Sequence, residues 1–437
     1  MDCGVPSKII EQYLLGKLSN NKNVLIVSHS FPPLENIAAK RYGFMAKYFP
    51  ASSWNPWVLT TRSSGLLPVN LPEERIFRLG EHPQKSRLIA KRRAGDHSSG
   101  VGRIRRSVGR AFSFRVIPTA GHLLRWHKMA ITEQRAILRK MGRIDLIIGS
   151  SPPSMSHWIA RRYASDLGVP WIADFRDLGA LKADYGNKLS IGVDKCAESY
   201  LLRSASAITV VTQHWAKMLH ASYRKTTRVV YNGWDMSDYP APANANTEGS
   251  PGIAGKYVYY AGRLCQHRMN SVYLLLRALR SFPDVRLVIR SLGPAHLVER
   301  LLDEAVSMKL KGQVEILPDV EYSVVLRESQ GALANAVFED IDINNSYSRG
   351  TLPGKIYETM CTSPPVLAIA RRDSEIGDIL SDTWKGQLCS TVKEIETFLN
   401  LVINSTRANR PDTRRINMFS RKEQAWNLCN LFDKVIR

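Results

Sequence analysis

The sequence predicts an α/β protein made of two successive units, each a parallel β-sheet wound with crossover helices. Short apolar runs rich in β-branched residues alternate with helical patterns along most of the 437 residues. The alternation stops at residues 236–255, which are rich in Pro, Ala, Gly and Asn, and then starts again. The length agrees with this division, because domains usually hold roughly 100–200 residues.

The first unit, residues 1–235, opens with a buried apolar strand at residues 23–28. A loop containing two prolines follows, and then a helical pattern that places Ala38, Tyr42 and Met45 on one stripe. Strand, loop, helix and strand in this order are typical of a parallel sheet. The other expected strands are 57–61, 145–149, 170–173, 207–211 and 228–231, and the other expected helices are about 155–167 and 192–204.

Residues 236–255 are expected to form a linker, and the second α/β unit is expected to span residues 256–415. Its first strand is 257–262. The remaining segment, residues 416–437, predicts an amphipathic C-terminal helix. The other expected strands of this unit are 285–289, 314–317, 333–337 and 366–369, and its expected helices are 271–280 and 353–362.

The composition indicates a globular chain without a metal centre. No apolar run approaches the ~18 residues that span a bilayer, and the first residues lack the apolar core of a signal peptide. The six cysteines are too scattered for a metal motif, and a chain of this size needs no disulfide framework, which predicts reduced thiols in the cytosol. The ten histidines show no metal-binding spacing, so we expect no metal site.

The net charge of +22 indicates an anionic partner, such as phosphate, nucleic acid or an acidic membrane surface. Residues 85–128 carry twelve Lys or Arg and a single acid, Asp96. Two interpretations stay open: a solvated basic loop, or a helix that lies on anionic lipid with arginines and apolar side chains alternating. The arginines concerned are Arg103, Arg105, Arg106, Arg110 and Arg115, and the apolar residues are Val101, Ile104, Val108, Phe112 and Phe114.

The strongest candidate binding segment is GTLPGKIYE, residues 350–358. Parallel α/β sheets bind ligands at the carboxyl ends of their strands, and two such units predict a site in the cleft between them. Thr351 suits a helix N-cap and Pro353 the first helical turn. The free amides there, together with Lys355, would attract an anion, and Glu358 would accept hydrogen bonds from ribose hydroxyls. Gly350 and Gly354 would let the backbone approach the ligand. The alternative is an ordinary capped helix with an exposed Lys–Glu pair.

Other candidate residues also lie at strand ends or in the loops that follow them. Arg263 comes directly after a strand and suits a diphosphate clamp, with Arg268 close behind it. A surface arginine is the alternative interpretation. The candidates for catalysis or for binding substrate hydroxyls are Asp174, Arg176 and Asp177, and those of an acceptor-side loop are Pro33, Asn36 and Arg41. For the first of these groups, an internal Arg–Asp pair remains the alternative.

Seven motifs together carry a resemblance to a known family. In chain order they are VLIVSHSFPP, DLIIGSSPP, WIADFRD, ITVVT, VVYNGWD, YYAGRL and PGKIYETMCTSPPVLAI. With this order and spacing, the chain resembles a GT-B glycosyltransferase of the large retaining family 4 type, which includes many bacterial surface-polysaccharide enzymes. The resemblance covers nearly the whole chain. It implies two Rossmann-like domains with parallel sheets that face each other across a cleft.

The resemblance also implies roles for individual residues. It implies a nucleotide sugar on the C-terminal domain, with Glu358 on the ribose and Arg263 on the diphosphate, and an acceptor on the N-terminal domain. Arg268 stands near the place of a lysine that the family usually has. Gly350 stands where many members have a glutamate. Asp174, Arg176 and Asp177 stand at the strand end where many members place a histidine near the sugar.

The resemblance implies transfer of a sugar from a UDP- or GDP-sugar to a saccharide or lipid-linked saccharide, with retention. The cationic residues and free amides named above predict that no obligatory metal or other cofactor is needed. The expected location is the cytoplasm, at the inner face of the membrane, with no nucleic-acid partner. Three alternatives stay open. They are an inverting reaction with Asp174 or Asp177 as the general base, a sugar-nucleotide epimerase or hydrolase of similar fold, and a non-catalytic basic binding protein.

Overall fold

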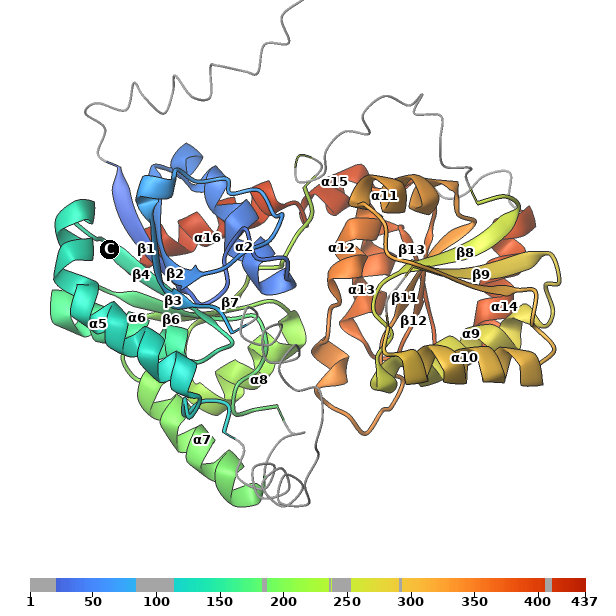
Figure 1. The fold of residues 1–437 in the computed structure, drawn as a ribbon, viewed down its shortest axis with the longest axis horizontal. Helices are drawn as coiled ribbons and strands as arrows, with labels where there is room; N and C mark the ends of the chain where they lie inside the picture. Colours follow the sequence, from blue (N-terminus) through green and yellow to red (C-terminus); the bar gives the residue numbers. More distant parts are fainter. Residues whose placement is uncertain are drawn as a thin grey trace, which may run out of the picture. The chain divides into compact units, whose positions relative to one another are not determined.

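The computed structural model describes residues 21–83, 114–182, 187–235, 237, 253–290, 293–404 and 411–437. Their strands form one sheet of seven strands and one of six, with helices on both faces (Figure 1). This confirms the predicted class, two Rossmann-like parallel sheets. Parallel pairing is recorded for every neighbouring pair of the six-stranded sheet, and for β1–β2, β1–β4, β2–β3 and β6–β7 of the other.

The seven-stranded sheet has the order β3-β2-β1-β4-β5-β6-β7. The winding direction reverses between β1 and β4, which is where doubly wound sheets bind ligands. Its strands are β1 (Lys22–Ser28), β2 (Trp54–Arg62), β3 (Ile76–Glu81), β4 (Leu146–Ser151), β5 (Trp171–Phe175), β6 (Ala207–Val210) and β7 (Thr227–Val229). Its helices are α2 (Ile37–Met45), α5 (Gly121–Met141), α6 (Met155–Leu167), α7 (Lys188–Leu202) and α8 (Gln213–Tyr223).

The six-stranded sheet has the order β10-β9-β8-β11-β12-β13, so its winding reverses between β8 and β11. Its strands are β8 (Lys256–Ala261), β9 (Val285–Arg290), β10 (Val314–Leu317), β11 (Ala334–Phe338), β12 (Val366–Ile369) and β13 (Gly386–Cys389). Its helices are α9 (Met269–Leu279), α10 (Ala295–Ser307), α11 (Tyr322–Gly331), α12 (Gly354–Met360), α13 (Glu375–Thr383), α14 (Val392–Asn404) and α15 (Thr413–Asn417).

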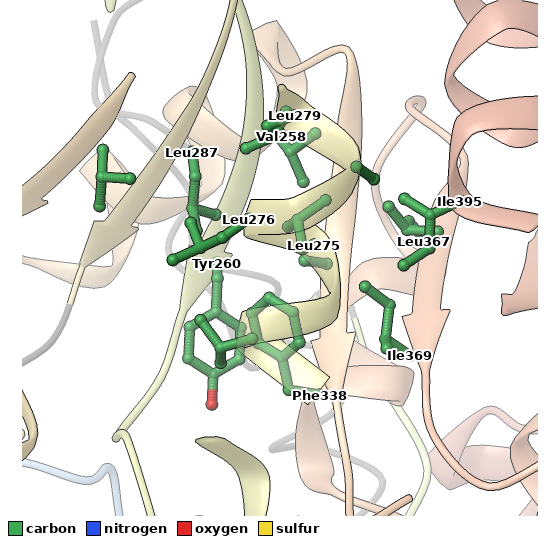
Figure 2. Packing of buried hydrophobic residues seen from close by; sticks show 14 of the residues in the cluster. Val258, Tyr260, Leu275, Leu276, Leu279, Leu287, Phe338, Leu367, Ile369 and Ile395 are labelled. Atoms are coloured by element: carbon green, nitrogen blue, oxygen red, sulfur yellow. The ribbon is translucent and has the colours of Figure 1, made fainter. Parts of the chain in front are cut away.

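Side-chain alternation along the strands explains why helices cover both faces of this sheet. Val258 and Tyr260 point to the face covered by α9, whereas Tyr257 and Tyr259 belong to a cluster on the other face. On the first face, Leu275 of α9 lies among buried residues of the strands (Figure 2). Full burial of a leucine contributes roughly 1.5–3 kcal/mol. This core fixes the carboxyl ends of β8 and β11, from which the candidate site is built.

The described residues divide into two compact units: those within 1–97, 118–172 and 429–437, and those within 98–117 and 173–428. Helix α16 (Arg421–Val435) therefore contributes its last residues to the first unit. There, the ring of Phe432 lies 5.1 Å from the ring of Trp54, and Asp433 Oδ1 lies 2.5 Å from Lys22 Nζ. The domain boundaries expected from the sequence stay a prediction.

The helix of the candidate binding segment differs from the prediction. It spans Gly354–Met360 rather than residues 353–362, and Pro353 is its N-cap with an extended backbone. The hydroxyl of Thr351 donates to the Tyr347 carbonyl at 3.4 Å and caps no helix, so its prediction as N-cap was wrong. Leu352 precedes a proline, and that position disfavours the α conformation. The same restriction at Ser363, before Pro364, ends the helix early.

Candidate functional site

The structure brings the ends of β8 and β11 and the start of α12 together at one edge of the six-stranded sheet. A Cβ placed on Gly262 would lie only 3.2 Å from Lys355 Cε. A pocket of about 350 Å³, solvent at its mouth included, is lined by residues of β8, α11, β11 and α12. Lys355 and Glu358 line it together with Tyr259, Asn335 and Thr359 among others. Two segments singled out in the sequence, 262–263 and 350–358, are therefore neighbours.

Lys355 and Glu358 form an ion pair on the wall of this pocket. Lys355 Nζ lies 2.8 Å from Glu358 Oε2, and their side chains are 33% and 19% exposed. An ionised carboxylate has about four lone-pair sites, so Glu358 can accept hydrogen bonds beyond the one from Lys355. The pair can therefore offer both a cation and a hydroxyl acceptor to a ligand in the pocket.

The two arginines of the predicted diphosphate clamp differ in their surroundings. Arg263 is exposed, directly after Gly262. Arg268 instead donates through Nη2 to Glu339, 2.9 Å away, a carboxylate whose side chain is 2% exposed. Burial raises the pKa of Glu339, but a hydrogen bond from His267 and the charge of Arg268 outweigh it and hold that pKa below its ordinary value. Arg268 is thus bound to a buried carboxylate that the sequence analysis missed.

Gly350 is packed against an aromatic ring. A Cβ at this position would lie 2.5 Å from Cδ1 and 2.6 Å from Nε1 of Trp215. Trp215 also stacks on Tyr347, with ring centroids 4.9 Å apart, and its indole N–H donates to the Tyr347 carbonyl at 3.2 Å. A glutamate therefore has no room at residue 350 in this arrangement.

The three predicted catalytic residues lie at the end of β5 and directly after it, and the structure gives them different surroundings. Asp174 is fully buried and accepts a hydrogen bond from Thr209 Oγ1 at 2.7 Å, while Arg176 is half-buried. Asp177 keeps a quarter of its side chain exposed. It accepts hydrogen bonds from Arg115 and the Tyr347 hydroxyl and lies 3.6 Å from Lys182 Nζ. Of the two aspartates, only Asp177 has a surface that a substrate can reach, and the catalytic assignments stay a prediction.

Two buried carboxylates of α7 support the segments around Asp177. Asp194 accepts hydrogen bonds from the backbone amides of residues 115, 116 and 117, at 2.6, 3.0 and 3.0 Å. Glu198 accepts from the Ala180 amide at 3.3 Å and from the Tyr223 hydroxyl at 2.5 Å. Burial raises the pKa of Glu198 to about 7. Neither contact could be predicted from the sequence, because the partners are distant in the chain.

The predicted acceptor-side residues either contact other residues of the first unit or are buried in it. Asn36 is the N-cap of α2, and its Oδ1 accepts from the Ala39 amide at 2.7 Å. Arg41 is buried, with 1% of its surface exposed. The Pro33 carbonyl accepts from the Leu67 amide at 3.2 Å. The contacts of Asn36 and Pro33 stabilise the loop and the start of α2. Direct binding of an acceptor by the three residues stays a prediction.

Three histidines missed by the sequence analysis meet at the carboxyl edge of the seven-stranded sheet. The ring of His29, which follows β1, lies 4.8 Å from that of His82 and 5.9 Å from that of His122. Burial, with the charge of His122 beside it, lowers the pKa of His82. Only the order β3-β2-β1 brings these positions together. Within the described ranges, no group of three or more His, Cys, Asp or Glu residues could hold a metal ion.

Comparison with known proteins agrees with this fold. Residues 56–233 match the family described as "Glycosyl transferase 4-like domain". No curated protein matches the sequence. A sucrose-phosphate synthase from Thermosynechococcus elongatus superimposes with a TM-score of 0.60 at 14% identity, over 95% of this chain and 99% of that one.

Two further solved structures show the same fold. HepE from Anabaena, in complex with UDP and glucose, has a TM-score of 0.59 at 13% identity, over 95% of this chain and 100% of its own. The lipopolysaccharide outer core galactosyltransferase WaaB has a TM-score of 0.57 at 13% identity, over 94% of this chain and 99% of its own.

Proposed function

We propose that this protein, a glycosyltransferase of the GT-B fold with a glycosyl transferase 4-like domain at residues 56–233, transfers a sugar from a nucleotide sugar to a saccharide or lipid-linked saccharide. The main supporting observation is the pocket beside Gly262 that Lys355 and Glu358 line. A UDP- or GDP-sugar is the proposed donor. UDP and UDP-glucose are the ligands named for the HepE structures, which share the fold.

The proposed mechanism follows from the charge that develops during transfer. Breaking the glycosyl–phosphate bond leaves negative charge on the nucleoside diphosphate, and fixed positive groups lower the barrier by stabilising it. In the proposed mechanism Arg263 and Lys355 supply this positive charge, while Glu358 accepts hydrogen bonds from the ribose hydroxyls. We propose that these cations allow transfer without a divalent metal and with retention of the anomeric configuration, in surface-polysaccharide synthesis.

A panel of nucleotide sugars tests this proposal. Thermal unfolding of the wild type is measured in EDTA with UDP-, GDP-, ADP- or dTDP-sugars added. The true donor should raise the midpoint temperature of unfolding most. A ligand at 100 times its Kd contributes about 2.7 kcal/mol to stability. Turnover in EDTA should require a saccharide acceptor. Consumption of the donor without any acceptor would instead support an epimerase or hydrolase, and a response only with Mn²⁺ would contradict metal independence.

We also propose that the basic segment brings the enzyme to the inner face of the membrane. Residues 84–113 lie outside the described residues. In the described continuation of this segment, Arg125 and Lys128 are exposed on α5, next to Leu124, which is 50% exposed. Arg115, by contrast, pairs with Asp177, so its predicted place in a lipid-facing stripe is not supported. None of the described helices has the length and apolarity needed to cross a membrane.

Flotation with liposomes tests the membrane proposal. The protein should float with vesicles containing phosphatidylserine at low salt, and binding should weaken toward 0.5 M salt because charge attraction is screened. Reversing the charges of Arg103, Arg105 and Arg106 should abolish flotation. The matched control reverses three exposed arginines of the C-terminal domain, Arg277, Arg280 and Arg300. Equal flotation of both variants, or none by the wild type, would overturn the proposal.

A further inference from the structure

A polar loop joins β11 to the candidate binding segment. Residues 340–348 lie between the carboxyl end of β11 and the turn at Ser348–Gly350, at the edge where doubly wound sheets bind ligands. Their sequence, DIDINNSYS, has only two aliphatic side chains, and one of these, Ile343, is 70% exposed. An apolar core therefore does not explain how this loop is ordered.

One buried guanidinium, that of Arg371, forms several hydrogen bonds with this loop. Arg371, which follows β12, is 5% exposed and lies behind the loop. Its Nη2 donates to the Ile343 carbonyl at 3.0 Å, and its Nη1 donates to Ser348 Oγ at 3.3 Å. Nη1 also donates to the carbonyls of Asp342 and Asn345. Asp373 neutralises the charge, with one carboxylate oxygen 2.5 Å from Nε and the other 3.2 Å from Nη2.

Asp340 closes the same loop from its other end. Its Oδ1 accepts from the Asp342 amide at 2.9 Å, and its Oδ2 accepts from Asn345 Nδ2 at 3.0 Å. The Asp340 carbonyl in turn accepts from the Arg371 amide at 3.2 Å. The loop is thus fixed mostly by hydrogen bonds to its backbone. The side chains of Asp342 and Asn344 remain exposed, and Asp342 Oδ1 accepts from the Asn344 amide at 2.9 Å.

We propose that Arg371 is a positioning residue for the sugar of the donor: it pre-forms the 340–348 loop so that exposed carboxylate and amide groups, those of Asp342 and Asn344, accept and donate hydrogen bonds to sugar hydroxyls. This inference rests on the proposed function. The guanidinium fork matters because it bonds several carbonyls at once in fixed directions, which a lysine ammonium on a flexible stem does not reproduce.

Separate measurements of sugar and nucleotide binding test the inference. UDP-glucose is compared with UDP, and GDP-mannose with GDP, by calorimetry. Arg371→Ala and Arg371→Lys should weaken binding of the sugar nucleotide tenfold or more and change binding of the nucleoside diphosphate less than twofold, with KM raised more than kcat is lowered. Arg372→Ala is the matched control, because Arg372 is the next residue and its side chain is 74% exposed. Arg372→Ala should change neither the Kd of the sugar nucleotide nor that of the nucleoside diphosphate.

Two further readouts separate positioning from a general loss of structure. Amide hydrogen exchange of residues 340–348 should accelerate in Arg371→Ala and stay unchanged in Arg372→Ala. Asn344→Ala, which removes an exposed side chain, should weaken sugar-nucleotide binding and leave thermal unfolding unchanged, so it tests the loop even if Arg371→Ala does not fold. The inference would be overturned if the Arg371 variants weakened binding of the nucleoside diphosphate as much as binding of the sugar nucleotide. It would also be overturned if neither Arg371→Ala nor Asn344→Ala weakened sugar-nucleotide binding. If the wild type binds no nucleoside diphosphate at all, the proposed function fails instead.

Discussion

Replacing Glu358 by alanine should weaken nucleotide-sugar binding about 10- to 100-fold and lower kcat/KM by a similar factor. Hydrogen bonds to a charged group contribute about 1.5–3 kcal/mol, and each 1.4 kcal/mol corresponds to a factor of ten. The variant should lose affinity for UDP by the same factor as for UDP-glucose, because the lost contact is to the ribose that both ligands share. The stability of the free enzyme should change little, since the Lys355–Glu358 pair is partly exposed and such pairs contribute about 0–1 kcal/mol.

Two control variants show whether the effect of Glu358→Ala comes from this carboxylate. Glu299→Ala removes an exposed glutamate from α10 of the same domain and should leave the Kd of the donor unchanged. Glu358→Gln keeps the shape and one acceptor oxygen, so its loss should be intermediate. Calorimetry and steady-state kinetics on the same preparations supply both constants. An unchanged Kd for the donor in Glu358→Ala would remove this residue from the binding site.

Replacing Arg268 by methionine should reduce the free energy of unfolding by about 3 kcal/mol. Glu339 would remain buried without its guanidinium partner, and breaking a buried pair costs about 3–5 kcal/mol. The lower end applies because His267, 3.5 Å away, can still interact with Glu339. Arg263→Met, at an exposed position nearby, should leave stability unchanged. Urea unfolding at equilibrium measures both, and a loss below about 1 kcal/mol for Arg268→Met would contradict the structural role assigned here.

The pH dependence of the same variant gives a second check. The folded state holds the pKa of Glu339 below its ordinary value, so the stabilisation it confers is present above that ordinary value and is lost as pH falls through the folded pKa. Arg268→Met removes this favourable partner of Glu339. Acidification should therefore narrow the difference in free energy of unfolding between the variant and the wild type. Adding Glu339→Gln to Arg268→Met should restore part of the lost stability, because the amide carries no charge to bury.

Much of the fold could be predicted because burial on both faces leaves a strong local signal. The strands at Val24–Val27 and Val366–Ile369 are continuous apolar runs, as parallel strands covered by helices require. The proximity of Gly262 and Lys355 agrees with a general property, since strand ends of one parallel sheet share an edge. Motif order added the fold family, which no single segment specifies.

The features that could not be predicted depend mostly on long-range contacts, which leave no local pattern in the sequence. The indole of Trp215 lies against Gly350, and the pairing of Arg268 with Glu339 spans 71 positions. Thr351 and Pro353 suited a helix start by residue type, but the backbone restriction before proline delays the helix. Arg371 was not among the candidate residues, because a charged residue after a strand is common. Only the folded loop shows that its hydrogen bonds go to backbone carbonyls, which sequence patterns do not record.

The contact between Lys22 and Asp433 has a consequence for synthesis on the ribosome. The two residues are 411 positions apart, and translation at about 5–20 residues per second separates their appearance by about 20–80 s. During that interval Trp54 and Phe49 lack the ring of Phe432 that covers them in the finished protein. The nascent first unit therefore lacks part of its aromatic packing for many seconds, and exposed apolar surface of this kind makes incomplete chains prone to aggregation.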